Sequence, residues 1–182
     1  MNAHDQLESD HTELDRLLEN IFEAIDGEDC TETYRRLDFF WARLAMHIRA
    51  EHLRLFPAVL QIGDSHLQDA GSGEVPADLV KIIDGLHDDH DFFMRSLARA
   101  IKAMRLVFDF GNEKETLAIV REMLEGVQGR LVPHNRIEED QIYPLASGKL
   151  LRTEDLDELS RTVRKELDNL PHRFAADQGT ER

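Results

Sequence analysis

The stretch HIRAEHLRLFP, residues 47–57, occurs a second time in related form as HNRIEEDQIYP, residues 134–144. Both copies share the pattern H-x3-E-x3-aliphatic-aromatic-Pro. On an α-helix, residues four apart lie about 40° apart around the axis and one turn apart along it. Each copy therefore directs an imidazole and a carboxylate to one side of a helix. The two pairs are His47 with Glu51 and His134 with Glu138.

Apolar residues recur at every third or fourth position through most of the chain, which is the period of a helix that buries one face. Four such stripes predict four long helices, and the short connections after the first and third predict antiparallel neighbours. The predicted fold class is therefore all-α, an antiparallel up-down four-helix bundle. The four stripes cover residues 7–25, 37–55, 79–108 and 117–145.

A fifth, shorter stripe covers residues 156–170, between Thr153 and Pro171. It predicts a short additional helix that lies on the outside of the bundle. The predicted organisation is a bundle over residues 1–150, a packed C-terminal helix over 151–171 and a mobile tail over 172–182.

Glycines follow the four stripes where left-handed helix caps are expected, at Gly27, Gly63, Gly111 and Gly148. The middle connection, GDSHLQDAGSGEVP, is polar and predicts a surface loop. Asn112 with Glu115 resembles a capping box that opens the fourth helix. Pro133 predicts a kink or bulge just before His134, which is either a tolerated irregularity or a feature that sets ligand geometry or opens a path for a small ligand.

Each predicted helix carries one histidine in its apolar stripe. Counted from the turns, antiparallel packing brings all four imidazoles to one level. A single core histidine is usually an ordinary packing residue, but two carboxylates share this layer, and buried carboxylates without a partner cost several kcal/mol each. No Lys or Arg occupies the stripe positions, so we expect metal to be the partner. The set is His11, His47, Glu51, His90, His134 and Glu138.

The order H…HxxxE…H…HxxxE resembles the hemerythrin-like (HHE cation-binding) family over roughly residues 8–146. Asp10-His11 and Asp89-His90 also mirror each other, as in a duplicated helical hairpin. The resemblance implies a four-helix bundle that holds two non-haem irons. By position, the four histidines named above would be terminal ligands, and Glu51 and Glu138 would bridge the two ions.

Two departures from the family pattern leave alternatives open. Oxygen-carrying hemerythrins supply a second histidine from the third helix, spaced H-x3-H, and this sequence has Leu86 and Met94 at those positions. His87 is a candidate fifth ligand, with a surface or supporting role as the alternative. Glu139 could replace Glu138 if the helix is wound differently there, although regular geometry favours Glu138.

Charge and composition restrict the partners. Lys and Arg total 22 against 37 Asp and Glu, a net charge of -15, so the surface should repel nucleic acid and anionic membranes. The chain contains no apolar run of about 18 residues and no signal pattern at its N-terminus. Cys30 is alone and can form no internal disulfide. We therefore predict a cytoplasmic protein that binds neither nucleic acid nor membrane.

Imidazole with carboxylate suits iron, zinc, manganese or copper. Two bridging carboxylates with a ligand from every helix suit an octahedral pair better than a structural tetrahedral zinc. We expect two non-haem iron ions, with zinc or manganese as alternatives and a single metal as a weaker third reading. A site rich in neutral imidazole should favour binding of a small ligand over high-valent oxidation chemistry.

Two function classes follow from such a site. The first is a binding protein for dioxygen, nitric oxide or iron itself, serving sensing, storage or delivery. The second is an enzyme that acts on peroxide or nitric oxide, or in iron-sulfur cluster repair. Whether the protein is an enzyme stays open, with binding preferred. A protein partner and a homo-oligomer are both compatible with the sequence.

Overall fold

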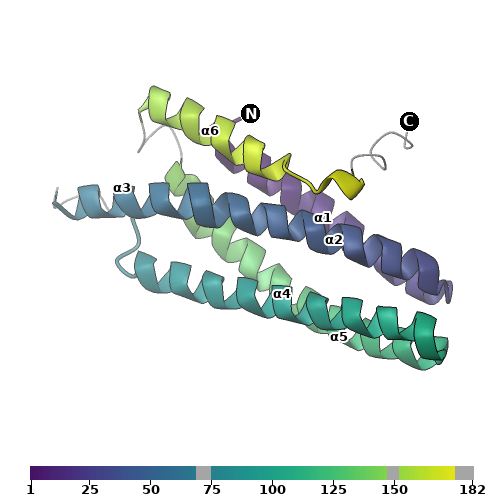
Figure 1. Ribbon diagram of the computed structural model, residues 1–182. Helices are drawn as coiled ribbons and strands as arrows, with labels where there is room; N and C mark the ends of the chain where they lie inside the picture. The colour runs from purple at the N-terminus through teal and green to yellow at the C-terminus, as the bar shows by residue number, and fades with distance from the viewer. Residues whose placement is uncertain (69–74, 147–151, 175–182) are drawn as a thin grey trace.

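The computed structural model describes residues 1–68, 75–146 and 152–174, and every regular element within these ranges is a helix. The predicted all-α class is confirmed. Long helices run side by side, and α6 lies along α1 and α2 (Figure 1). The elements are α1 (Ala3–Asp26), α2 (Cys30–Ala50), η1 (Glu51–Leu55), α3 (Phe56–Gln68), α4 (Leu79–Phe110), α5 (Glu113–Ile137), η2 (Glu138–Ile142), η3 (Tyr143–Ala146), α6 (Thr153–Leu167) and η4 (His172–Phe174).

The helices form two hairpins. Helix α1 packs on α2, α4 packs on α5, and α2 packs on α4, which joins the hairpins. Helix α2 continues through the π-helical turn η1 into α3 as one rod, and α5 continues directly into a second π-helical turn, η2. No helix in the described part of the chain has an apolar stretch long enough to cross a membrane.

Side chains and backbone geometry define the helix ends. The carboxamide of Asn2 accepts the backbone N–H of Asp5, and the carboxylate of Asp29 accepts that of Glu32, each at 2.8 Å. These bonds satisfy N–H groups that have no partner inside the first turn of a helix. Gly111 ends α4 with a positive φ of 78°, but its ψ of -152° is not that of the predicted left-handed cap.

Several predicted helix ends are wrong. Gly27 has a φ of -76°, and the left-handed residue at that turn is Glu28. The capping box is absent, because Asn112 is itself left-handed and its side chain makes no cap bond. Gly63 lies inside α3, so the helix extends into the segment predicted as a loop. Gly148 lies outside the described residues.

The C-terminal region also differs in part from the prediction. Helix α6 packs on α1 and α2, as expected for a helix on the outside. Residues 172–174, predicted as part of the tail, form a 3-10 turn in which Phe174 is buried against Phe39, with ring centroids 5.5 Å apart. An aromatic contact of this kind favours an ordered position. Residues 175–182 lie outside the described part of the chain.

The core consists of two apolar clusters with a polar layer between them. One cluster contains Leu14, Leu44, Phe93 and Leu131, and the other contains Leu7, Leu55, Leu86 and Ile142. Along each helix, the histidine stands between a member of the first cluster and a member of the second. Tight apolar packing on both sides separates this layer from water.

Candidate metal centre

The structure brings the six sequence-predicted residues together in the layer between the two apolar clusters. Glu51 and Glu138 are fully buried, and no member of the set is more than 4% exposed. Their ligand atoms form two groups that can hold a metal ion and that share Glu138. The first group is His11, His47, Glu51 and Glu138; the second is His90, His134 and Glu138.

Glu51 directs its two oxygens to opposite hairpins. Its Oε1 lies 3.4 Å from Nε2 of His47 in the first hairpin, and its Oε2 lies 3.3 Å from Nε2 of His90 in the second. Glu138 does the same. Its Oε2 lies 3.3 Å from Nε2 of His11, and its Oε1 lies 3.2 Å from Nε2 of His134. Both carboxylates therefore span two clusters of imidazole nitrogens.

The second ring nitrogen of each histidine has its own partner. Nδ1 of His47 lies 2.9 Å from Asp10, and Nδ1 of His134 lies 3.1 Å from Asp89. A carboxylate at Nδ1 takes the ring proton there and leaves the Nε2 lone pair free, which is the usual arrangement behind a metal-binding histidine. The mirrored Asp-His pairs thus serve equivalent roles, because each aspartate supports the histidine of the neighbouring helix.

The other two histidines differ between the hairpins. Nδ1 of His11 lies 2.8 Å from Oε1 of Glu139, and Nδ1 of His90 lies 2.8 Å from Nε2 of His52. Glu139 and His52 occupy equivalent positions of the repeat, each directly after the buried glutamate. Glu139 therefore supports His11 from outside, while Glu138 points inward, as regular helix geometry favoured.

His87 is not a member of either ligand group. Its ring lies beside that of His52, with centroids 4.3 Å apart, and beside Phe56 at 5.4 Å. His52 is itself half-buried, and its Nε2 lies 2.8 Å from Nδ1 of His90. The third helix thus supplies one inward imidazole and a second imidazole outside the cluster.

Both buried glutamates stand at the start of a π-helical turn. Glu51 begins η1 and Glu138 begins η2, and in each turn the carbonyl of the glutamate accepts the N–H of the aromatic residue five positions later. A π turn is wider than an α turn, so it returns residue i+5 to the side of residue i. The bulge predicted just before His134 is not there, because α5 runs through Pro133 as far as Ile137, and the irregular turn begins only at Glu138.

The second π turn carries a hydroxyl into the layer. Tyr143 donates to Oε1 of Glu51 at 2.7 Å and lies 3.0 Å from Nε2 of His11. Burial and the charges of Glu138 and Glu51 hold the pKa of Tyr143 well above its usual value, so the phenol stays protonated. The equivalent residue of the first repeat is Phe56, which stacks on His90 and has no hydroxyl. The aromatic-Pro ending of the repeat was visible in the sequence, but this difference in role was not.

Each of the two aspartates also forms an ion pair with an arginine. Arg43 pairs with Asp10 and Arg130 pairs with Asp89. Each arginine stands four residues before the histidine of its repeat, in RLAMH and RLVPH. The repeat is therefore longer than the stretch that begins at the histidine, and this signal could have identified both arginines.

Apart from the oxygen bonded by Tyr143, several acceptors at the centre of the layer have no donor. With the ring protons at Nδ1, the Nε2 atoms of His11 and His47 face each other at 3.0 Å as lone pairs. Among the described residues, Oε2 of Glu51 and Oε1 of Glu138 are buried and accept no hydrogen bond; their nearest imidazoles are not in hydrogen-bonding geometry. Burying unpaired acceptors is costly. A cation between these atoms removes that cost, so the residues fit a metal.

Protons can neutralise the same atoms. Burial acts to lower the pKa of His47, but the carboxylates of Glu51 and Asp10 outweigh it and hold that pKa well above the usual value. Burial likewise acts to raise the pKa of Glu51, yet the imidazoles of His47 and His90 hold it well below its usual value. The cluster can therefore exist as buried ion pairs, and metal and protons compete for it.

Comparisons of the chain with models of protein families, with curated proteins and with solved structures gave no match. The case for a function therefore rests on the arrangement of the side chains. That arrangement is a buried cluster of histidines and glutamates that can hold a metal ion.

Proposed function

We propose that this protein is a hemerythrin-type four-helix bundle that holds two non-haem irons and binds dioxygen or nitric oxide. One observation carries the proposal. Glu51 and Glu138 each present one oxygen to the imidazoles of the first hairpin and the other oxygen to those of the second. A carboxylate placed in this way suits a bridge between two cations.

The ligand assignment follows from the two hairpins. His11 and His47 would hold one ion, His90 and His134 would hold the other, and the two glutamates would be shared. Imidazole with carboxylate is a donor set that iron accepts readily. Bound iron supplies reversible affinity for a small diatomic molecule.

The surrounding side chains orient the ligands and shield the layer from water. Asp10, Asp89 and Glu139 hold the ring protons at Nδ1 and so keep Nε2 free. The apolar clusters on both sides exclude water, which strengthens electrostatic interactions inside the layer. The hydroxyl of Tyr143 places a polar hydrogen at the centre, where it can orient a small polar ligand.

The same hydroxyl supports a second candidate, an enzyme that acts on peroxide or nitric oxide. Tyr143 lies between Glu51 and His11, and its raised pKa keeps a proton at that point. A positioned proton donor is what reductive chemistry on such substrates requires. Turnover in the presence of an electron donor would distinguish this candidate from reversible binding.

Metal analysis of anaerobically purified protein tests the main proposal. We expect about two irons per chain, the number of a bundle-core carboxylate site, and an optical spectrum that changes on adding oxygen and returns on removing it. Glu51→Gln and Glu138→Gln should lose iron, whereas the exposed Glu125→Gln serves as the matched control. Circular dichroism verifies that each variant is folded. Retention of both irons in the two buried variants would refute the ligand assignment.

A further inference from the structure

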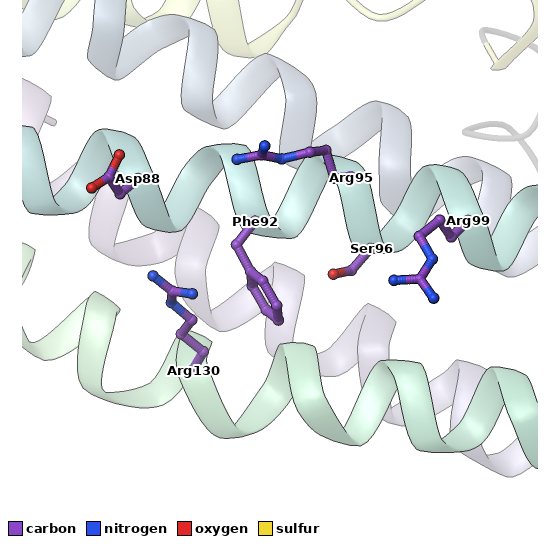
Figure 2. A pocket seen from close by; sticks show the side chains of 6 residues that line it. All are labelled: Asp88, Phe92, Arg95, Ser96, Arg99 and Arg130. Carbon is purple, nitrogen blue, oxygen red and sulfur yellow. The ribbon is translucent and has the colours of Figure 1, made fainter.

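A polar groove outside the buried layer lies on the surface of the second hairpin, between α4 and α5. It is a groove of about 440 Å³ lined by Asp88, Phe92, Arg95, Ser96, Arg99 and Arg130. Figure 2 shows the Phe92 ring between Arg130 on one side and Ser96 and Arg99 on the other. The guanidinium of Arg130 lies over this ring at 4.7 Å from its centroid.

This groove corresponds to one that α6 covers on the first hairpin. That smaller groove, of about 230 Å³, includes Ser9, Glu13 and Arg43, together with Leu167 and Asp168 at the end of α6. The internal repeat pairs Ser9 with Asp88, Glu13 with Phe92, and Arg43 with Arg130. The arginine at this place is therefore buried beside α6 in the first hairpin, here called the covered groove, and exposed in the second, here called the open groove.

The covered groove shows what its arginine binds. Arg43 is buried, pairs with Asp10 and donates a further hydrogen bond of 3.0 Å to the carbonyl oxygen of Leu167. Leu167 is the last residue of α6, and the carbonyls at a helix C-terminus carry partial negative charge. Besides the carboxylates of Asp10 and Glu13, Arg43 thus has an electronegative acceptor oxygen that α6 supplies.

The open groove lacks the equivalent acceptor. Arg130 pairs with Asp89 in the same way as Arg43 with Asp10, but its side chain remains 43% exposed and no described helix covers it. Within the described part of the chain, Arg99 makes no ion pair or hydrogen bond, and Arg95 bonds only to exposed Asp91, donating from Nε to its carbonyl oxygen at 3.0 Å and pairing with its carboxylate at 3.3 Å. The guanidinium groups therefore have donors to spare.

We propose that this groove binds a phosphate group, either as inorganic phosphate or as a phosphate monoester. The lining of the groove contributes three guanidinium groups and the Ser96 hydroxyl but only one acidic side chain, Asp88, on a chain whose net charge is -15. Guanidinium forks match the oxygens of phosphate in a bidentate manner. The Phe92 ring offers an apolar surface to the organic part of an ester.

The bound phosphate would stand where Leu167 of α6 stands in the first hairpin. Arg130 would bridge it to Asp89, which contacts Nδ1 of His134. The inference needs no metal in the buried layer, and it goes beyond the proposed function. It is tested on the full chain both with and without metal, so its failure is distinct from failure of the metal assignment.

Isothermal titration calorimetry with inorganic phosphate and with phenyl phosphate tests the site. We expect saturable binding of one equivalent, weakened about tenfold or more in Arg99→Ala because a charge-assisted contact is lost. Arg99→Lys should recover part of the affinity, and Arg130→Ala should weaken it as well. Arg16→Ala, which removes an exposed arginine from α1, is the matched control and should bind like the unmodified protein.

The two probes distinguish the sources of the phosphate. Tighter binding of phenyl phosphate, lost in Phe92→Ala, would assign the groove to a monoester, and equal binding would assign it to inorganic phosphate. Absence of saturable binding for both probes would overturn the proposal. Binding that Arg99→Ala and Arg130→Ala leave unchanged, or that Arg16→Ala weakens equally, would also overturn it, because the charge of the whole surface would then be responsible.

Discussion

The hydroxyl of Tyr143 donates a 2.7 Å hydrogen bond to Oε1 of Glu51, and so joins the end of the fourth long helix to the glutamate of the second. Both residues are fully buried. The bond crosses the layer between the two apolar clusters and supplies one of the few donors that the carboxylates have there. The repeat places a phenylalanine, Phe56, at the equivalent position, so the bond exists in one half only.

Tyr143→Phe should therefore destabilise the metal-free protein while leaving its fold intact. Loss of the donor leaves a buried carboxylate oxygen less satisfied, which typically costs about 1–3 kcal/mol. With metal bound the cost should be smaller, because the cation replaces the donor. Urea denaturation with and without chelator measures both values. Tyr34→Phe, which removes a hydroxyl that accepts an exposed bond from Arg105, is the control, and loss of metal in Tyr143→Phe would contradict a role confined to the metal-free state.

The two supporting aspartates should respond differently to the same substitution. Asp10→Asn leaves Arg43 buried without its main charge partner and should cost roughly 3 kcal/mol of stability. Asp89→Asn affects an exposed arginine and should cost less than about 1 kcal/mol. Both variants should bind metal about 10–100-fold more weakly, because the ring nitrogen loses its charged acceptor. Chemical denaturation and metal titration separate the two effects, and equal stability losses would contradict this account of the pairing.

The sequence predicted the helical class and the six residues of the layer because both depend on regular α-helical spacing. Stripes at three and four residues indicated which faces are buried, and antiparallel connections brought four histidines to one level. Glu138 rather than Glu139 points inward for the same reason. The order of apolar residues therefore carried most of the information about the site.

The features that the sequence did not reveal arise where the helices depart from that spacing. The π turns that begin at Glu51 and Glu138 return the aromatic residue to the side of the glutamate. Residue types alone do not indicate a π turn, so the sequence predicted neither the position of the Tyr143 hydroxyl beside Glu51 nor the contact of His52 with His90. Asp10 and Asp89 were visible as a repeated pattern, but their partners lie on the neighbouring helix and depend on packing.

His52 should remain neutral far below the usual range of a histidine. Burial, followed by the charges of His90 and His87, lowers its pKa to about 4. Proton NMR of the metal-free protein should show the ring of His52, assigned with His52→Gln, titrating near that value rather than near the unfolded value of about 6.5. A midpoint close to 6.5 would mean that the contact with His90 does not persist in solution.

The lowered pKa of His52 also makes the stability of the fold depend on pH below neutrality. Between about pH 4 and 6.5 the unfolded chain binds a proton at His52 and the folded chain does not. The free energy of unfolding therefore gains from His52 above about pH 6.5, and this gain is lost as the pH falls toward 4. In His52→Gln, the loss of stability over this window should be shallower than in the unmodified protein. Parallel slopes for the two proteins would exclude the contribution.

The dependence of melting temperature on pH distinguishes a layer held by buried ion pairs from one that holds metal. The pKa of His47 is held well above its usual value by Glu51 and Asp10, which outweigh the opposite effect of burial. A raised folded pKa contributes stability below the unfolded value of about 6.5 and loses it as the pH rises through the folded value. Chelator-treated protein should therefore melt at a lower temperature at pH 9 than at pH 6.5.

Metal-loaded protein should instead melt at a lower temperature as the pH falls, because protons displace the metal from its nitrogen ligands. Melting curves across this range, with and without chelator, measure both slopes. If the two forms respond to pH alike, metal and protons do not share these atoms, and the centre of the layer is not the cation site.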